Sequence, residues 1–255
     1  MAYVSWLTIA PVKGLALVEV DEIVLGPKGV RENRRFYLVD ADGRRYGLLR
    51  DGRLALVKPA YDSARDRLEL AFPDGKVVSG EVAVDGEVTT DFYGRPVTGR
   101  LVHGPWSDAL SAHVGRPVRL VRREAGTAVD RSRGPVSMLS DASLEELRLR
   151  AGRAERVDPA RFRMLIGIGG VGPHEEDEWI GRRVRVGEAV VLLHEQVARC
   201  AITTQNPKTG VPDFDTLREI KAYRGVRDRK LIDFGVYGDV DEPGRVRLGD
   251  PIDPV

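Results

Sequence analysis

Cys200 is the only cysteine in the 255 residues, and it lies between Arg199 and a polar segment in the stretch VARCAITTQNPKTG, residues 197–210. A neighbouring guanidinium favours the thiolate over the thiol, and a thiolate acts as a nucleophile or as a soft metal ligand. The hydroxyl residues Thr203 and Thr204 are typical of a polar turn that presents the sulfur in a cleft. Free cysteines are also among the most often buried residues, so a purely structural role is the alternative.

The other residues with chemical potential give weaker signals. The four histidines show no metal-ligand spacing, and His194 with Glu195 lacks the second histidine of a metalloprotease motif. The glycine-rich segment 167–172 has neither a following lysine nor the G-x-G-x-x-G pattern of a phosphate-binding loop. It is more typical of a turn that ends a strand. Cys200 therefore remains the main candidate for chemistry.

The elements that must position this cysteine are mostly short strands. Alternating β-branched segments predict strands at Val18–Leu25, Phe36–Val39, Leu68–Phe72, Val118–Val121 and Arg245–Leu248. Asp-Gly pairs separate such segments and favour hairpin turns; they occur at 42–43, 51–52, 74–75 and 85–86. The first half is therefore expected to be an antiparallel meander or barrel.

Three helices are expected among the strands. Trp106, Leu110 and Val114 share one helical face, and Gly115 follows as a stop signal. A second helix is predicted over 141–152. The third is predicted near residues 216–224, where Thr216 and Glu219 fit a capping box.

Composition limits the possible partners and location. Lys plus Arg number 40 against 39 for Asp plus Glu, so no global basic field draws the chain to nucleic acid or to an anionic membrane. One cysteine forms no internal disulfide, and neither a secretory leader nor a membrane-spanning segment is recognisable. These features predict a cytoplasmic protein whose partners are small molecules. The β-rich first half of the sequence ends near residues 115–118, which predicts two domains, 1–117 and 118–255.

The cysteine segment and six further motifs resemble the MOSC superfamily, named for the C-terminal domain of molybdenum cofactor sulfurases. The motifs occur in the family's order along nearly the whole chain: Ile9–Gly14, Arg35–Val39, Leu139–Leu147, Arg161–Arg163, Glu176–Trp179, the cysteine segment and Val246–Ile252. The resemblance implies a mainly β, α+β fold, in which a MOSC β-barrel domain with a few helices packs on an N-terminal antiparallel β-barrel-like domain. Similar family members are the amidoxime reducing component and its bacterial counterparts.

The resemblance also assigns residues to a molybdenum cofactor (molybdopterin). Cys200 takes the position of the family's thiolate ligand to molybdenum, a soft donor suited to that metal. Lys13, Arg35, Arg163 and Arg199 match the positions expected to bind the cofactor's terminal phosphate. The acidic segment Glu175–Glu178 is expected to edge the pocket.

Several pocket positions depart from the family pattern. Gly14 and Ala198 replace hydroxyl residues, and Met164-Leu165 stands where relatives have Pro-Asn, so hydrogen-bonding groups are lost while the cysteine and the cations persist. Either arginines within 131–133 compensate, or the chain binds a variant cofactor, or it has a different task.

The implied activity is oxygen-atom transfer that reduces N-hydroxylated or N-oxide compounds, with Cys200 as a permanent molybdenum ligand. Because a lone cysteine cannot hold an iron-sulfur cluster, the electrons would come from a separate donor protein. The alternatives are a sulfur or molybdenum-cofactor carrier that uses Cys200 as a persulfide site, and a metal-free binding module.

Overall fold

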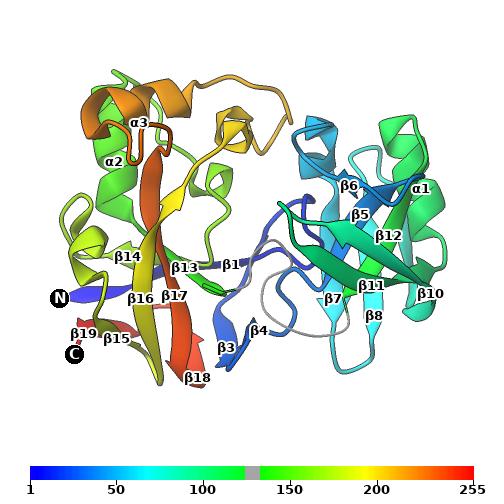
Figure 1. Ribbon diagram of the computed structural model, residues 1–255, viewed down its shortest axis with the longest axis horizontal. Coiled ribbons are helices and arrows are strands. Elements are labelled where there is room, and N and C mark those ends of the chain that lie inside the picture. Colours follow the sequence, from blue (N-terminus) through cyan, green and yellow to red (C-terminus); the bar gives the residue numbers. More distant parts are fainter. Residues whose placement is uncertain (124–132) are drawn as a thin grey trace.

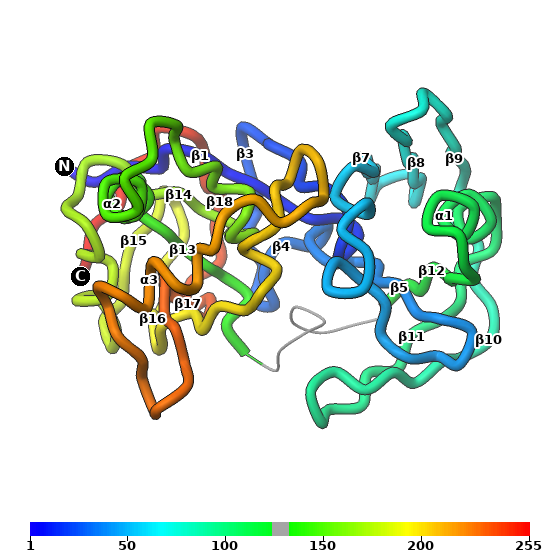
Figure 2. Tube along the Cα trace, turned by 90° about the horizontal axis from the view of Figure 1, so that it is seen from above, coloured from blue at the N-terminus to red at the C-terminus, as the bar shows by residue number. Residues whose placement is uncertain are grey.

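The computed structural model describes residues 1–123 and 133–255, which form two lobes (Figures 1 and 2). One, the barrel lobe, contains β13–β17, the helices α2 and α3, and both chain ends. The other, the sheet lobe, contains β5–β12 and the helix α1. The cysteine segment belongs to the barrel lobe and faces the sheet lobe.

The barrel lobe is built on a closed seven-stranded barrel. Its strands follow the order β14-β13-β17-β16-β15-β19-β1, and a pairing of β1 with β14 closes the ring. The pairs are antiparallel except for β13 with β14, which is parallel. The strand bounds are β1 Ala2–Ile9, β13 Val136–Ser140, β14 Ile166–Gly169, β15 Arg183–Val186, β16 Ala189–Ala198, β17 Asp233–Glu242 and β19 Pro251–Pro254. The short β2, Val18–Glu19, pairs antiparallel with the end of β1.

The sheet lobe contains two antiparallel sheets. The larger has the order β10-β11-β12-β5-β6, and β7, β8 and β9 form the smaller. In a third sheet, of order β18-β3-β4, strands from the N-terminal part of the chain pair with β18 from the C-terminal part. The bounds are β3 Glu22–Gly26, β4 Gly29–Val30, β5 Phe36–Asp40, β6 Arg45–Tyr46, β7 Lys58–Asp62, β8 Arg67–Ala71, β9 Val77–Glu81, β10 Ala83–Asp91, β11 Pro96–His103, β12 Val118–Arg123 and β18 Gly244–Arg247.

Three α-helices occur within the described residues, at the predicted places. They are α1 Trp106–Val114, α2 Asp141–Arg150 and α3 Thr216–Arg224. Gly115 ends α1 in the left-handed region at φ 71°, and Ser140 caps α2 by accepting from Ser143 N. Short 3-10 helices fill several connections: Gly52–Leu56, Pro159–Arg161, Glu175–Trp179 (η3) and Ala201–Thr204 (η4).

The predicted capping box at α3 is wrong. Asp215 caps the helix, because its carboxylate accepts from Arg218 N at 3.1 Å. Thr216 is fully buried, and its hydroxyl lies 2.6 Å from the hydroxyl of Thr203. A side chain expected to cap the helix instead joins α3 to the segment that follows Cys200.

Two other local expectations need correction. The strand predicted over Val18–Leu25 is divided into β2 and β3, because the chain passes from the barrel edge to the third sheet between them. Among the Asp-Gly pairs, 42–43 and 74–75 lie in hairpin turns, whereas Asp51 caps a 3-10 helix and the pair 85–86 lies at a register shift inside β10. A bulge accounts for the last case, since glycine accepts the positive φ of 53° at residue 86.

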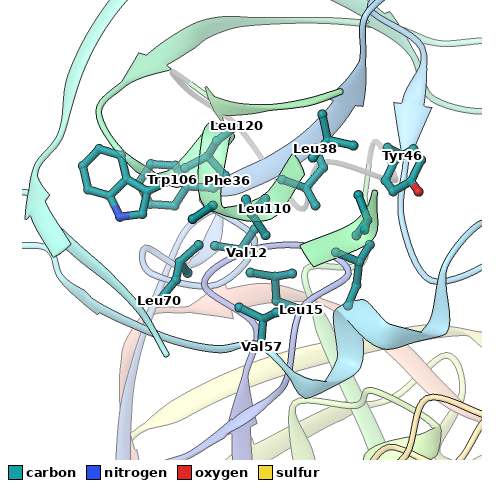
Figure 3. Close-up of a cluster of buried hydrophobic side chains, with 14 of the residues drawn as sticks. Val12, Leu15, Phe36, Leu38, Tyr46, Val57, Leu70, Trp106, Leu110 and Leu120 are labelled. Carbon is teal, nitrogen blue, oxygen red and sulfur yellow. The ribbon is translucent and has the colours of Figure 1, made fainter. Parts of the chain in front are cut away.

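Each lobe has its own hydrophobic core. In the sheet lobe the ring of Trp106 packs with Phe36, Leu110 and Leu120 (Figure 3). In the barrel lobe Val4, Ile166, Val191 and Val236 fill the barrel interior. A third cluster between the barrel and the helices α2 and α3 contains Phe162, Met164 and Phe234, and this cluster supports the cysteine segment.

The strands are shared across the predicted domain boundary at 117/118. β1 and β2, from the first part of the sequence, belong to the barrel lobe, and β12, which begins at Val118, pairs with β5 and β11 in the sheet lobe. The division at 117/118 stays a prediction, but the exchange of strands ties the two lobes together.

Candidate functional site

A cavity of about 1000 Å³ lies between the two lobes, and Cys200 is part of its wall. Lys13, Arg163 and Arg199 also line it, so four of the five residues predicted for the site meet in one cavity. The walls come from the region of β5 and β6 and the β10–β11 turn on one side, and from residues 161–164 and the end of β16 on the other.

Cys200 is exposed, which excludes the reading of a buried structural cysteine. It directly follows β16 and precedes η4, the 3-10 helix that forms the predicted polar turn. Its carbonyl accepts from both the backbone N and the hydroxyl of Thr203 at 3.1 Å. These bonds are made by the backbone of Cys200 and not by its side chain. The exposed sulfur is therefore available for chemistry.

The guanidinium of Arg199 is directed into the barrel lobe. Its Nε donates to Phe234 O at 2.7 Å and its Nη1 to Phe162 O at 2.9 Å, while Nη2 contacts Met164 Sδ at 2.9 Å. These contacts join the end of β16 to β17 and to residues 162–164. Arg199 therefore holds the backbone next to Cys200 in place.

Arg163 and Lys13 bring positive charge to the cavity from opposite lobes. Arg163 has φ 53°, and its Nη2 donates to Leu15 O across the lobes at 2.8 Å. Lys13 is half-buried, and its backbone N donates to Phe36 O at 2.8 Å. Such fixed cations are suited to an anion in the cavity.

Arg34, rather than Arg35, lies in the cavity wall. The Nη2 of Arg34 donates to Arg163 O at 3.4 Å. Arg35 is directed to Tyr61: burial raises the pKa of Tyr61, and Arg35 acts in the opposite direction. The structure therefore does not bring Arg35 to the other predicted residues, and sequence reasoning missed its neighbour.

The positions that depart from the family pattern have local explanations. Gly14 has φ 94°, a conformation that favours glycine over serine. Met164 is buried against Arg199, and Leu165 belongs to the barrel core. Of the arginines proposed to compensate, Arg133 lies 3.5 Å from Asp239, and Arg131 lies outside the described residues.

The segment after Cys200 also contacts the sheet lobe. Gln205 Nε2 donates to Leu48 O at 2.8 Å. Gly52 and Gly210 approach so closely that a Cβ on Gly52 would stand 1.8 Å from Gly210 O, so neither position accepts a side chain without movement. These contacts hold the cysteine segment against the opposite wall of the cavity.

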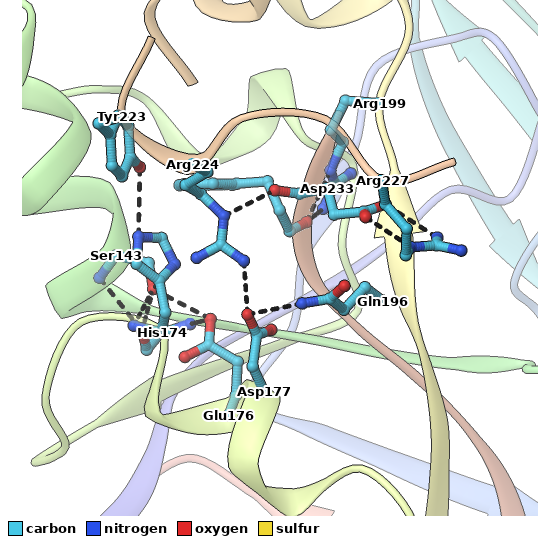
Figure 4. Close-up of polar contacts among 12 residues, drawn as sticks. Ser143, His174, Glu176, Asp177, Gln196, Arg199, Tyr223, Arg224, Arg227 and Asp233 are labelled. Carbon is cyan, nitrogen blue, oxygen red and sulfur yellow. Dashed lines mark hydrogen bonds and ion pairs between the residues drawn. The ribbon is translucent and has the colours of Figure 1, made fainter. Parts of the chain in front are cut away.

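A polar network behind the cavity was not foreseen from the sequence (Figure 4). Asp177 accepts from Arg224 Nη2 at 2.5 Å and from Gln196 Nε2 at 2.8 Å, and Arg224 Nε donates to Asp233 O at 3.0 Å. The network connects η3, β16, α3 and β17. Its members are far apart in sequence, so no local pattern signals them.

The expectation that Glu175–Glu178 edges the pocket is wrong. Glu176 is fully buried behind the cavity wall, where its Oε1 accepts from Ser140 N and Ser143 Oγ at 3.1 Å. Burial raises the pKa of this carboxyl. The acidic segment thus has a structural place under α2.

The accessibility of Cys200 predicts a simple labelling result. In native buffer, 5,5′-dithiobis(2-nitrobenzoic acid) is expected to modify one thiol per chain, because the single cysteine is exposed. The Cys200→Ser variant provides the blank. A thiol that reacts only after denaturant is added would contradict the placement of Cys200 in an open wall.

Comparison with known proteins adds family information to this geometry. Residues 111–253 match the MOSC domain, and residues 1–104 match the MOSC N-terminal beta barrel domain. Mitochondrial amidoxime-reducing component 1 from Mus musculus is 33% identical over 160 residues, which are 60% of this chain and 45% of that protein. The human component 1 is 26% identical over 279 residues, 98% of this chain and 82% of that protein.

Two further similarities are more distant. Molybdenum cofactor sulfurase from Danio rerio is 24% identical over 91% of this chain and 31% of that protein. Among solved structures, the YuaD protein from Bacillus subtilis covers 98% of this chain and 93% of its own, with a TM-score of 0.46 and 15% identity. The named relatives support a function related to the molybdenum cofactor. Within residues 1–123 and 133–255, no helix is long and apolar enough to cross a membrane.

Proposed function

This chain belongs to the MOSC domain family, and on that basis we propose that it is a molybdenum-cofactor-dependent reductase of N-hydroxylated or N-oxide compounds, with Cys200 as the protein ligand to molybdenum. The observation that carries the proposal is the exposed Cys200 in the wall of the cavity between the lobes. The names of the mouse and human relatives add the substrate class.

The residues of the cavity fit a phosphate-bearing cofactor with a soft metal. A thiol is open to the cavity, and Lys13 and Arg163 supply cations from both lobes. The volume of about 1000 Å³ leaves room for a small substrate beside a bound cofactor. The lost hydrogen-bonding groups at Gly14, Met164 and Ala198 do not remove the thiol or these cations.

The chain's own residues have distinct tasks in this proposal. When bound, the cofactor supplies a metal that changes oxidation state and accepts the oxygen atom of the substrate. Cys200 provides the thiolate ligand, and Arg199 holds the backbone that carries it. Lys13 and Arg163 bind the terminal phosphate. The buried Phe162 and Met164 form an apolar part of the wall, which limits water at the site.

We infer that the electrons come from a separate donor protein, because the single cysteine cannot hold an iron-sulfur cluster. The balanced charge of the chain favours a small-molecule substrate and neither nucleic acid nor a membrane as a partner. The cytoplasmic location stays a prediction, since the curated relatives are named as mitochondrial.

The test is to produce the protein in a host that makes molybdenum cofactor. Elemental analysis is expected to find about one molybdenum atom per chain, as one cavity cysteine is present. The loaded protein is expected to reduce benzamidoxime with an artificial electron donor. Absence of molybdenum would overturn the proposal, and molybdenum without turnover would favour the cofactor-carrier alternative.

A further inference from the structure

The cavity has a second chemical feature in the sheet lobe, away from Cys200. Arg45 lies on β6, and its guanidinium carbon stands 3.9 Å from the ring centroid of Tyr93 and 5.6 Å from that of Phe92. All three residues line the cavity. A guanidinium stacked on an aromatic ring keeps its N–H edge free for an acceptor.

Arg45 differs from its neighbours in lacking an anionic partner. Arg44 pairs with Asp42 at 2.9 Å, and Arg50 pairs with Asp40 at 2.8 Å. Among the residues that the structure describes, no carboxylate forms an ion pair with Arg45, and its buried Nε has no acceptor. A half-buried cation without a partner is unfavourable unless a ligand supplies one.

The aromatic partner of Arg45 is held in a strained place. Tyr93 has φ 59° in the turn between β10 and β11, where a bulky residue is rare and asparagine or glycine is preferred. Tyr93 is 66% exposed although the neighbouring Phe92 is buried. Figures 1 and 2 show this hairpin end on the side of the sheet lobe that faces the barrel lobe. Backbone strain that is retained at the opening of a cavity indicates a residue that contacts a ligand.

We propose that Arg45 and Tyr93 form a substrate-recognition subsite for an oxyanion, so that the preferred substrates are N-hydroxylated compounds that carry a carboxylate. The proposal rests on the proposed reductase function, whose reacting centre lies at Cys200 in the same cavity. Arg45 binds the carboxylate through its free N–H edge, and Tyr93 fixes the orientation of the guanidinium. The apolar part of the substrate lies against the exposed side chains of Tyr93 and Leu49, which both line the cavity.

The same chemistry fits an anion of the cofactor, and the experiment separates the two sources. Benzamidoxime and 4-carboxybenzamidoxime are compared as substrates of the loaded protein, as the ratio of their kcat/KM values. Wild type is expected to favour the carboxylated compound by about tenfold, the effect of one charge-assisted contact in a partly exposed site. In Arg45→Met the ratio is expected to fall to about one, since the charge is lost while the apolar stem remains.

Three controls keep the outcome specific. Arg44→Met removes an adjacent charge that is already paired, and the ratio is expected to stay at the wild-type value. Tyr93→Asn keeps a residue suited to positive φ but removes the ring, and the ratio is expected to fall part of the way. Calorimetric titration of the protein without cofactor with 4-carboxybenzamidoxime is expected to show binding that Arg45→Met weakens.

Two results would overturn the subsite. One is an equal loss of the ratio in Arg44→Met, which would assign it to general charge. The other is loss of molybdenum from Arg45→Met, which would assign Arg45 to the cofactor. Failure of benzamidoxime reduction in wild type would instead remove the proposed function, while the calorimetric arm would still test the subsite.

Discussion

Cys200→Ser is expected to lower both molybdenum content and amidoxime reduction by at least about a hundredfold, which is the upper range of the effect when only a hydrogen-bond partner of a metal ligand is lost. The hydroxyl of serine is a hard donor that stays protonated at neutral pH, whereas a thiolate is a soft donor suited to the metal. The sulfur is the exposed thiol of the cavity wall, so no other cysteine can replace it. Elemental analysis and benzamidoxime turnover measure the two losses.

The fold is expected to survive this substitution. The sulfur is exposed, and the carbonyl of Cys200, rather than its side chain, accepts the bonds that begin η4. The free energy of unfolding in denaturant should therefore change by no more than about 0.5 kcal/mol, as for other exposed substitutions. Ala201→Ser is the matched control, because it adds the same hydroxyl at the next exposed position, which is not part of the cavity wall. Full metal and activity in Cys200→Ser would refute the ligand assignment.

The sequence predicted those residues of the site that belong to short local motifs. Cys200, Arg199 and Arg163 stand in short segments whose residue types already suggest binding, and the structure brings them to one cavity. Arg35 was expected with them because it begins a recognisable segment. The chain turns at Arg34, with φ 55°, two residues before β5 begins, so the alternation of the strand does not tell which arginine faces the cavity.

Long-range pairing explains what the sequence did not reveal about the fold. Local patterns identified β5, β8 and β12 as strands: β8 alternates buried and exposed residues, whereas β5 is a short apolar run that is buried on both faces. It could not show that β1 closes the barrel against β14, more than 150 residues away, since partner and register depend on tertiary packing. The role of Arg45 escaped notice for the same reason, because Tyr93 lies on a different hairpin.

His174 is expected to make the protein acid-sensitive. Its ring lies between Ser143 Oγ, 3.2 Å from Nδ1, and Tyr223 Oη, 3.2 Å from Nε2, and it packs on Phe234 (Figure 4). The pKa of His174 is lowered from 6.5 to about 4, chiefly by burial and also by the charge of Arg224, while Asp177 and Glu146 act in the opposite direction. The imidazole is therefore neutral in the folded protein at neutral pH.

The sign of the effect follows from the two states. Below pH 6.5 the unfolded chain binds a proton at His174, whereas the folded protein does not bind it until the pH approaches 4. The contribution of His174 is thus fully present above pH 6.5 and is lost as the pH falls from 6.5 to 4. That shift corresponds to at most about 3 kcal/mol of unfolding free energy, and solvent around the part-buried ring screens this to less. Denaturant titrations at a series of pH values measure it.

The matched variants separate burial from hydrogen bonding. In His174→Asn, a residue that tolerates the φ of 59°, this part of the pH dependence is expected to disappear, although lost ring packing lowers stability at every pH. In Tyr223→Phe it is expected to persist, because burial is the larger cause of the shift. An unchanged slope in His174→Asn would show that other groups cause the acid sensitivity.

Since α3 supports Thr203 behind Cys200 through Thr216, protonation of His174 is also expected to loosen the cysteine segment before the barrel unfolds.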